Sequence, residues 1–131
     1  MNQDVESAFA EMLDISTDID KAVLFGSGKV LASNMSSEVQ AAAVAQAAEL
    51  SRLGELRATD MGSQPLTQLV VETPAGLVFL AREIAPDGMT VLATGKKGSR
   101  IGLVLYDLRT CMRDAREAMT GSLDGQGTGE A

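Results

Sequence analysis

The chain has 131 residues, a formal net charge of −7, no histidine and a single cysteine. Its length suits one domain. The lack of histidine excludes imidazole as a general base or metal ligand, and one cysteine without histidine argues against a zinc site. The acidic balance argues against nucleic-acid binding, because no excess of cations is present to neutralise phosphates. We therefore expect no metal, no cofactor and no nucleic-acid partner.

The sequence also indicates the cellular compartment in which the protein is expected. It contains no run of about 18 apolar residues, so direct insertion into a membrane is not expected. No basic stretch precedes an apolar one near Met1, so we expect no signal peptide. The lone Cys111 cannot form an internal disulfide, which favours a reducing, cytoplasmic setting.

The first expected element is a helix over residues 2–16. Its apolar side chains recur at helical spacing, at Val5, Ala8, Phe9, Met12 and Leu13. No Lys or Arg precedes Lys21, whereas acidic residues occur at Asp4, Glu6, Glu11, Asp14, Asp18 and Asp20. Such a run of charge usually marks a solvated face, and the alternative is an electrostatic docking surface for a basic partner.

Two short strands, over residues 21–25 and 29–33, are expected next. The glycines of the intervening Gly26-Ser27-Gly28 can supply the positive φ that a tight hairpin needs. A helix is then expected from residue 36 to about 56. One of its faces carries Val39, Ala43, Ala47 and Leu50, and small apolar residues cover most of the remainder. Either alanine serves only as a good helix former, or a second face meets another protein closely.

Three strands are expected in the centre of the chain, over residues 66–73, 77–83 and 89–94. Their Val, Leu, Thr and Phe suit a half-buried pleated surface. The links 74–76 and 86–88 each begin with Pro and end with Gly, which favours tight turns and therefore antiparallel neighbours.

The last expected helix follows a basic loop over residues 95–100. Ser99 is expected to be its N-cap, and Cys111 lies on its apolar stripe, where a buried thiol is expected. The loop lacks the spacing of a P-loop. Residues 121–131 contain four glycines and almost no apolar side chains, which predicts a disordered tail after a single domain over residues 1–120.

The expected fold is α+β in the order α-β-β-α-β-β-β-α, with a five-stranded antiparallel sheet. The second helix is expected on one face of the sheet and the terminal helices on the other. This order and several stretches resemble the roadblock / dynein light chain family, specifically its small bacterial members, over about residues 3–120. The matching stretches are 22–25 with 28–32, the Ala-rich helix from Val39, 69–72 with 76–80, and 90–93 followed by Gly102.

The resemblance implies a dimer in which the third strand pairs with its mate and the second helices lie side by side. Bacterial members of the family commonly partner Ras-like small GTPases, as scaffold, effector or GTPase-activating protein. The activating type inserts no arginine of its own. We therefore expect a homodimeric, non-enzymatic regulator or scaffold of a Ras-like small GTPase, with no catalytic residues.

The self-association surface is expected on the third strand and the second helix, at Leu66, Gln68, Val70, Glu72, Ala41, Ala42, Ala45 and Ala48. Partner contacts are expected at Glu38, Glu49 and Arg52. The alternative function is a small-molecule sensor with a profilin-like or PAS-like fold, which would need polar groups converging on a core cavity. An enzyme is not expected, because the sequence has no histidine and no close carboxylate pair with a reason for a shifted pKa.

Overall fold

The computed structural model describes the backbone of residues 2–129 and the side chains of residues 2–121. Its elements follow the expected order and are α1 (Gln3–Ile15), β1 (Ile19–Gly26), β2 (Lys29–Ser33), α2 (Ser37–Asp60), β3 (Gln68–Thr73), β4 (Gly76–Arg82), β5 (Thr90–Lys96) and α3 (Ile101–Gly129). No helix in the described part of the chain is long and apolar enough to cross a membrane.

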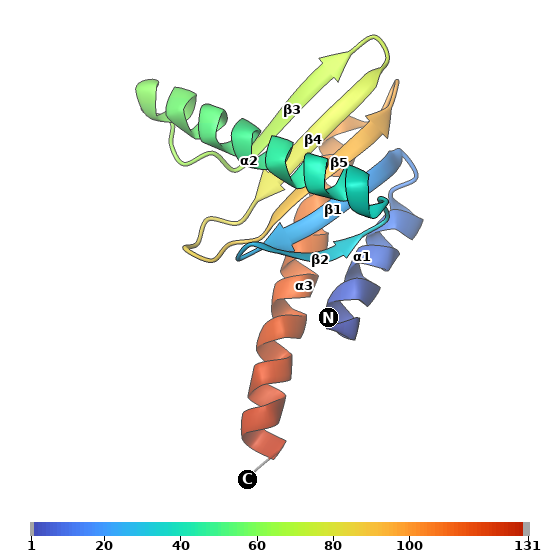
Figure 1. Cartoon of the computed structure of the whole chain (residues 1–131), viewed down its shortest axis with the longest axis vertical. Helices are drawn as coiled ribbons and strands as arrows, with labels where there is room; N and C mark the ends of the chain where they lie inside the picture. The colour runs from blue at the N-terminus through green and yellow to red at the C-terminus, as the bar shows by residue number, and fades with distance from the viewer. Residues whose placement is uncertain (1, 130–131) are drawn as a thin grey trace.

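The five strands form one antiparallel sheet in the order β2-β1-β5-β4-β3 (Figure 1). Ser27 and Gly28 have φ angles of 51° and 74°, so the β1–β2 turn uses the left-handed region that the glycine-containing sequence predicts. β5 lies in the middle, between β1 and β4. β2 and β3 are therefore the two edges of the sheet.

The sheet separates two apolar layers (Figure 1). α1 and α3 lie side by side on one face, and α2 crosses the other, as the sequence predicts. The α1–α3 layer is built from large buried side chains such as Val5, Phe9, Met12, Phe79, Val104 and Leu108. The α2 layer buries Ala43 and Ala47 against Val23, Leu80 and Leu92.

Several boundaries differ from the sequence-based expectation. β1 begins at Ile19 and β5 ends at Lys96, each two residues beyond the expected strand. α2 extends to Asp60, one turn beyond residue 56. β3 begins at Gln68 and not at Leu66. The reason is that the backbone N–H of Leu66 donates to the Glu55 carboxylate at 3.3 Å, and its carbonyl accepts from Nε of Arg82 at 2.5 Å. Side chains therefore satisfy Leu66 where a strand partner would otherwise do so.

The start of α3 also differs from expectation. The helix begins at Ile101, and Oγ of Ser99 donates to the Lys96 carbonyl at 2.5 Å, so Ser99 is not its N-cap. Asp18, which is distant in the chain, holds the residue just before the helix, because its Oδ2 accepts the backbone N–H of Arg100 at 2.9 Å and the side-chain Nε of Arg100 at 3.1 Å. The hydrogen bond from the Arg100 backbone, followed by that from its side chain, lowers the pKa of Asp18.

The far end of α3 is longer than the sequence predicts. The helix continues to Gly129, although glycine disfavours helix interiors. Residues 130–131 of the expected tail lie outside the described residues. The disorder expected for residues 121–131, and the domain limit at residue 120, stay predictions.

Candidate functional site

The edge strand β3 is the most open part of the sheet. It pairs with β4 from Gln68 to Thr73, and no strand of the described chain borders its other side. Gln68 and residues 71–73 are exposed, whereas β4 and β5 are mostly buried. An edge of this kind presents unpaired backbone N–H and C=O groups, which can pair with a strand from another chain.

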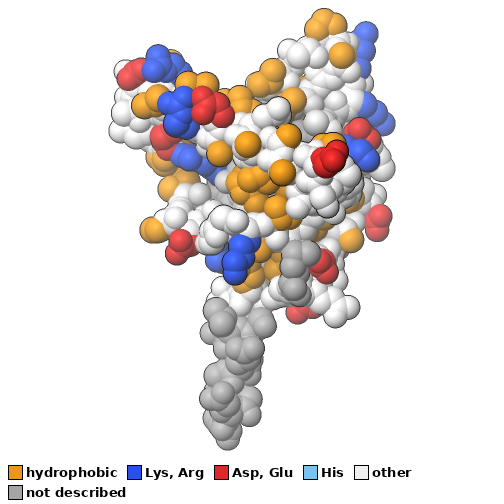
Figure 2. All heavy atoms as spheres, viewed as in Figure 1, with side chains coloured by type: hydrophobic (Ala, Val, Ile, Leu, Met, Phe, Trp, Pro, Cys, Tyr) orange, Lys and Arg blue, Asp and Glu red, His pale blue; other side chains and the backbone are white. Residues whose placement is uncertain are grey.

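The outward face of α2 lies above this sheet and carries the expected interface alanines. Ala43 and Ala47 point to the sheet and are buried, and the expected residues Ala41, Ala42, Ala45 and Ala48 are all exposed. In Figure 2 this side of the molecule has charged side chains at both ends of α2, with many apolar and other uncharged ones between them. The exposed Glu49 and Arg52 add charge near the middle of the helix. Small side chains along such a stretch permit a second helix to approach closely.

Three larger apolar residues of α2 were not expected at this surface. Val39 is 54% exposed, Leu53 44% and Leu56 43%. Sequence periodicity had placed Val39 on the buried face with Ala43, but Val39 lies at the beginning of α2, where it remains accessible. The outward half of α2 thus exposes both small and large apolar side chains, which is typical of surfaces that contact another protein.

The four expected strand residues do not share one face. Leu66 packs with the α2 layer, next to Leu69. Val70 packs against the α1–α3 core, and Oε1 of Gln68 accepts a hydrogen bond from Nη1 of Arg109 in α3 at 2.6 Å. Glu72 is exposed. These residues share a position in the open edge strand or just before it. A strand that docked there would meet side chains from both faces of the sheet.

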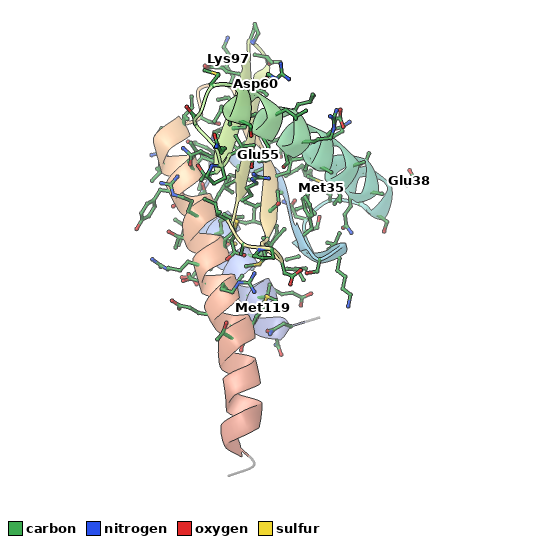
Figure 3. The ribbon with its side chains drawn as sticks, turned by 90° about the vertical axis from the view of Figure 1, so that its left-hand side faces the viewer. Met35, Glu38, Glu55, Asp60, Lys97 and Met119 are labelled. Atoms are coloured by element: carbon green, nitrogen blue, oxygen red, sulfur yellow. The ribbon has the colours of Figure 1, made fainter. Side chains whose placement is uncertain are left out.

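An ion pair fastens α2 to the beginning of β3. Glu55 of α2 pairs with Arg82 of β4, and both side chains are largely shielded from solvent. Figure 3 shows Glu55 on the side of α2 that faces the sheet, between the ends of the helix marked by Glu38 and Asp60. The same two side chains hold the backbone of Leu66. Sequence reasoning missed this group, because its members are far apart in the chain.

Gly54 of α2 allows the helix to approach Leu66 and Leu69 closely. A Cβ atom on Gly54 would lie only 2.7 Å from Cδ2 of Leu66 and 3.2 Å from Cδ1 of Leu69. Glycine within a long helix was the available sequence signal, since it usually has a packing reason. Gly54, Glu55 and Arg82 together set how α2 sits above the open edge.

The expected partner-binding residues are all on the exposed surface of α2. Nη2 of Arg52 lies 2.6 Å from Oε1 of Glu49, and both side chains are more than half exposed. The hydrogen bond from Arg52 lowers the pKa of Glu49. Glu38 is exposed in the first turn of the helix. Exposed ion pairs contribute little stability. Breaking the Glu49–Arg52 pair to bind charged groups of a partner would therefore cost little free energy.

The cavity between α1 and α3 measures about 50 Å³, whereas small-molecule sites occupy roughly 300–1,000 Å³. Larger hollows of about 270–400 Å³ lie open at the surface, one of them beside Asp18 and Lys96 and another beside Glu55 and Arg82. Among the described residues, no three His, Cys, Asp or Glu side chains gather as metal ligands do. The most developed feature is therefore the surface formed by β3 and α2.

Comparison with solved structures gives the fold. No protein-family model and no curated protein matches the sequence. A roadblock/LC7 domain from Streptomyces avermitilis is 17% identical with a TM-score of 0.77, over 89% of this chain and 98% of that chain. MglB from Myxococcus xanthus is 12% identical with a TM-score of 0.70, over 89% and 95%. A structure of MglB in a tetrameric arrangement is 16% identical with a TM-score of 0.63, over 89% and 91%.

Proposed function

We propose that this chain, which has the roadblock/LC7 fold, is a homodimeric regulator of a Ras-like small GTPase and not itself an enzyme. The observation that carries the proposal is the open edge of β3 lying beside the outward face of α2. This surface would allow a second copy to pair with the backbone of β3 and to pack a helix closely against α2. The setting we propose is the cytoplasm.

Self-association through this surface satisfies two requirements at once. Two copies of β3 running antiparallel would pair their open backbone groups across a twofold axis. The two α2 helices would then lie together, with Ala41, Ala45 and Ala48 permitting close approach. Burying Leu53 and Leu56 at the same time would remove exposed apolar area from water. The tetrameric MglB arrangement supports self-association in this fold.

The GTPase is proposed to contact charged side chains of α2 that border the dimer contact, where Arg52 lies one helical turn after Ala48. Glu38, Glu49 and Arg52 are exposed there, and two of them form a weak pair that a partner can replace. The family resemblance of the sequence supports a Ras-like partner. A small-molecule sensor is the weaker candidate, because the cavity between α1 and α3 measures only about 50 Å³ and the larger hollows, of about 270–400 Å³, lie open at the surface.

Any stimulation of GTP hydrolysis is proposed to come from arranging the GTPase's own residues. Arg52 and Arg57 are the cations of α2, and each already pairs with an acidic residue on the same helix. A catalytic arginine finger contributes about 10³–10⁵ in rate. Arg52→Ala and Arg57→Ala should therefore leave stimulated hydrolysis within about tenfold of the wild type at saturating regulator.

The experiment uses a Ras-like small GTPase from the same organism as this protein. Calorimetry should show tighter binding to one nucleotide state, because a regulator shifts a switch only through different affinities for its two states. Equal affinity for the GDP and GTP-analogue forms, or no binding to either, would contradict the proposal. Single-turnover hydrolysis with Arg52→Ala and Arg57→Ala then distinguishes a scaffold mechanism from an arginine finger. A loss of 10³ or more in the stimulated rate would identify the replaced residue as a finger.

A further inference from the structure

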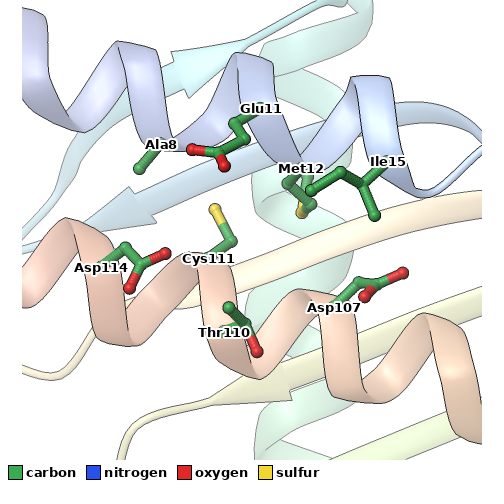
Figure 4. A pocket seen from close by; sticks show the side chains of 8 residues that line it. All are labelled: Ala8, Glu11, Met12, Ile15, Asp107, Thr110, Cys111 and Asp114. Atoms are coloured by element: carbon green, nitrogen blue, oxygen red, sulfur yellow. The ribbon is translucent and has the colours of Figure 1, made fainter.

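The second feature of interest is a groove between α1 and α3, on the side of the sheet opposite α2. The two helices pack together there, with the end of α1 beside the beginning of α3 (Figure 4). The cavity in this groove is lined by Ala8, Glu11, Met12, Ile15, Asp107, Thr110, Cys111 and Asp114. Its volume is about 50 Å³.

Asp107 is unusual among the residues that line this groove. Its side chain is only 9% exposed. Among the residues that the structure describes, no hydrogen-bond donor reaches its buried Oδ2. Buried carboxylates normally have a donor or a cation, because removing the charge from water without one is costly. The fold therefore leaves this buried carboxylate oxygen, in a residue that lines the cavity, without a donor from the described chain.

The surroundings favour a positively charged donor. Glu11 and Asp114 line the same cavity, and α1 contains Asp4, Glu6, Glu11 and Asp14 but no Lys or Arg. Nη2 of Arg113 lies 3.3 Å from Asp114, but its side chain is 63% exposed, and it does not line the cavity. Burial raises the pKa of the Cys111 thiol to about 12, so this lining group stays neutral. The groove thus holds several negative charges and no cation of its own.

The rim of the groove is apolar at the end where Asp107 lies. Ile15 is 62% exposed, and Figure 4 shows it across the groove from Asp107. Leu103, one helical turn before Asp107 on α3, is 43% exposed. A Lys or Arg side chain matches this pattern, because its long apolar stem covers apolar surface while its head carries the charge.

We propose that the α1–α3 groove is a docking site for a Lys or Arg side chain of a partner protein, with Asp107 as its counter-ion. Ile15 and Leu103 contact the stem of that side chain or its apolar neighbours. The surface is separate from the β3 edge and from α2, so it can be occupied while the chain self-associates. A metal ion is the poorer occupant, since the described residues hold no cluster of metal ligands.

The test titrates the full-length, isotope-labelled protein with the peptide acetyl-Leu-Arg-Leu-amide and follows its amide resonances. Saturable shifts are expected at Ala8–Ile15 of α1 and around Asp107–Asp114 of α3. Replacing the arginine of the peptide by neutral citrulline, or Asp107 by Asn, should weaken binding by at least about tenfold. The control variant Asp14→Asn, which removes an exposed carboxylate of α1 that does not line the cavity, should bind as the wild type does.

Equal weakening in Asp14→Asn and Asp107→Asn would show diffuse attraction to an acidic helix and overturn the proposal. Absence of saturable shifts at the groove would overturn it as well. Melting temperatures give an independent check that the fold does not depend on Asp107. Asp107→Leu should melt at or above the wild-type temperature, because it removes a buried acceptor that lacks a donor. A clear fall in both Asp107→Leu and Asp107→Asn would show that Asp107 is bonded within the fold, and would refute the docking role.

Discussion

The two faces of the sheet are covered in different ways. On one face, α1 and α3 bury large side chains, including Phe9, Met12 and Leu108. On the other, α2 buries two alanines, and a glycine and the Glu55–Arg82 pair bring its second half close to the sheet. The α1–α3 layer therefore provides most of the apolar burial. The α2 layer is thin, and it leaves its outward side chains available to a second protein.

The largest expected effect is a difference in stability between matched truncations of the two layers. Leu108→Ala in α3 removes a fully buried side chain and should destabilise the protein by about 2–5 kcal/mol. Leu50→Ala in α2 removes a half-buried one and should cost less, under about 2 kcal/mol. Urea unfolding of both variants measures the difference. Equal losses would show that α2 contributes as much to stability as α3 does.

The next effect concerns the attachment of α2. Glu55→Ala removes the carboxylate that pairs with Arg82 and accepts the backbone N–H of Leu66. It should destabilise by about 1–2 kcal/mol, because Arg82 keeps its hydrogen bond to the Leu66 carbonyl. Hydrogen exchange should quicken in the second half of α2 and at the beginning of β3. The exposed Glu49→Ala is the control, and should leave exchange rates there unchanged.

Protonation of Asp18, on the opposite side of the sheet from α2, should destabilise the protein in acid. Its pKa is lowered from the ordinary value of 3.8, chiefly by the backbone hydrogen bond from Arg100. Its stabilising effect is thus fully present above about pH 4 and is lost as the pH falls through the lower, native pKa. Asp18→Asn should reduce stability at neutral pH and flatten the decline below pH 4. Urea midpoints across pH 2–7 measure this, with Asp14→Asn as the control.

The smallest effect is expected from the tail. Deleting residues 121–131 should change stability by no more than about 0.5 kcal/mol, the range for changes that touch no packed surface. Thermal melts of the full and shortened chains provide the comparison. A fall of several degrees would show that the tail docks against the domain.

The sequence predicts the architecture well, for reasons that are local. Helical and alternating periodicities identify the elements, and the Gly- and Pro-containing links at 26–28, 74–76 and 86–88 fix the hairpins. The order of the strands does not follow from such patterns, because β5 inserts between β1 and β4 through contacts distant in the chain. Only the folded sheet shows that β3 is an open edge.

The site could be predicted only in part. The exposed alanines of α2 follow from the helical period, once its buried face is known. The Glu55–Arg82–Leu66 contacts and the hydrogen bonds from Arg100, just before α3, to Asp18 could not be predicted, because they join residues up to 82 positions apart. For the same reason, nothing in the sequence indicates that Asp107 would be buried with an unpaired oxygen.

The central claim is that β3 and the outward face of α2 form a homodimer, and Ala45 lies in the middle of that surface. Light scattering across a dilution series should give twice the chain mass of 13.7 kDa for the wild type. Ala45→Glu should give a folded monomer, because it places a charge where two helices approach closely, while the control Ala10→Glu on α1 should stay dimeric. A wild-type monomer at micromolar concentration, or an Ala45→Glu variant that dimerises as tightly as the wild type, would contradict the account.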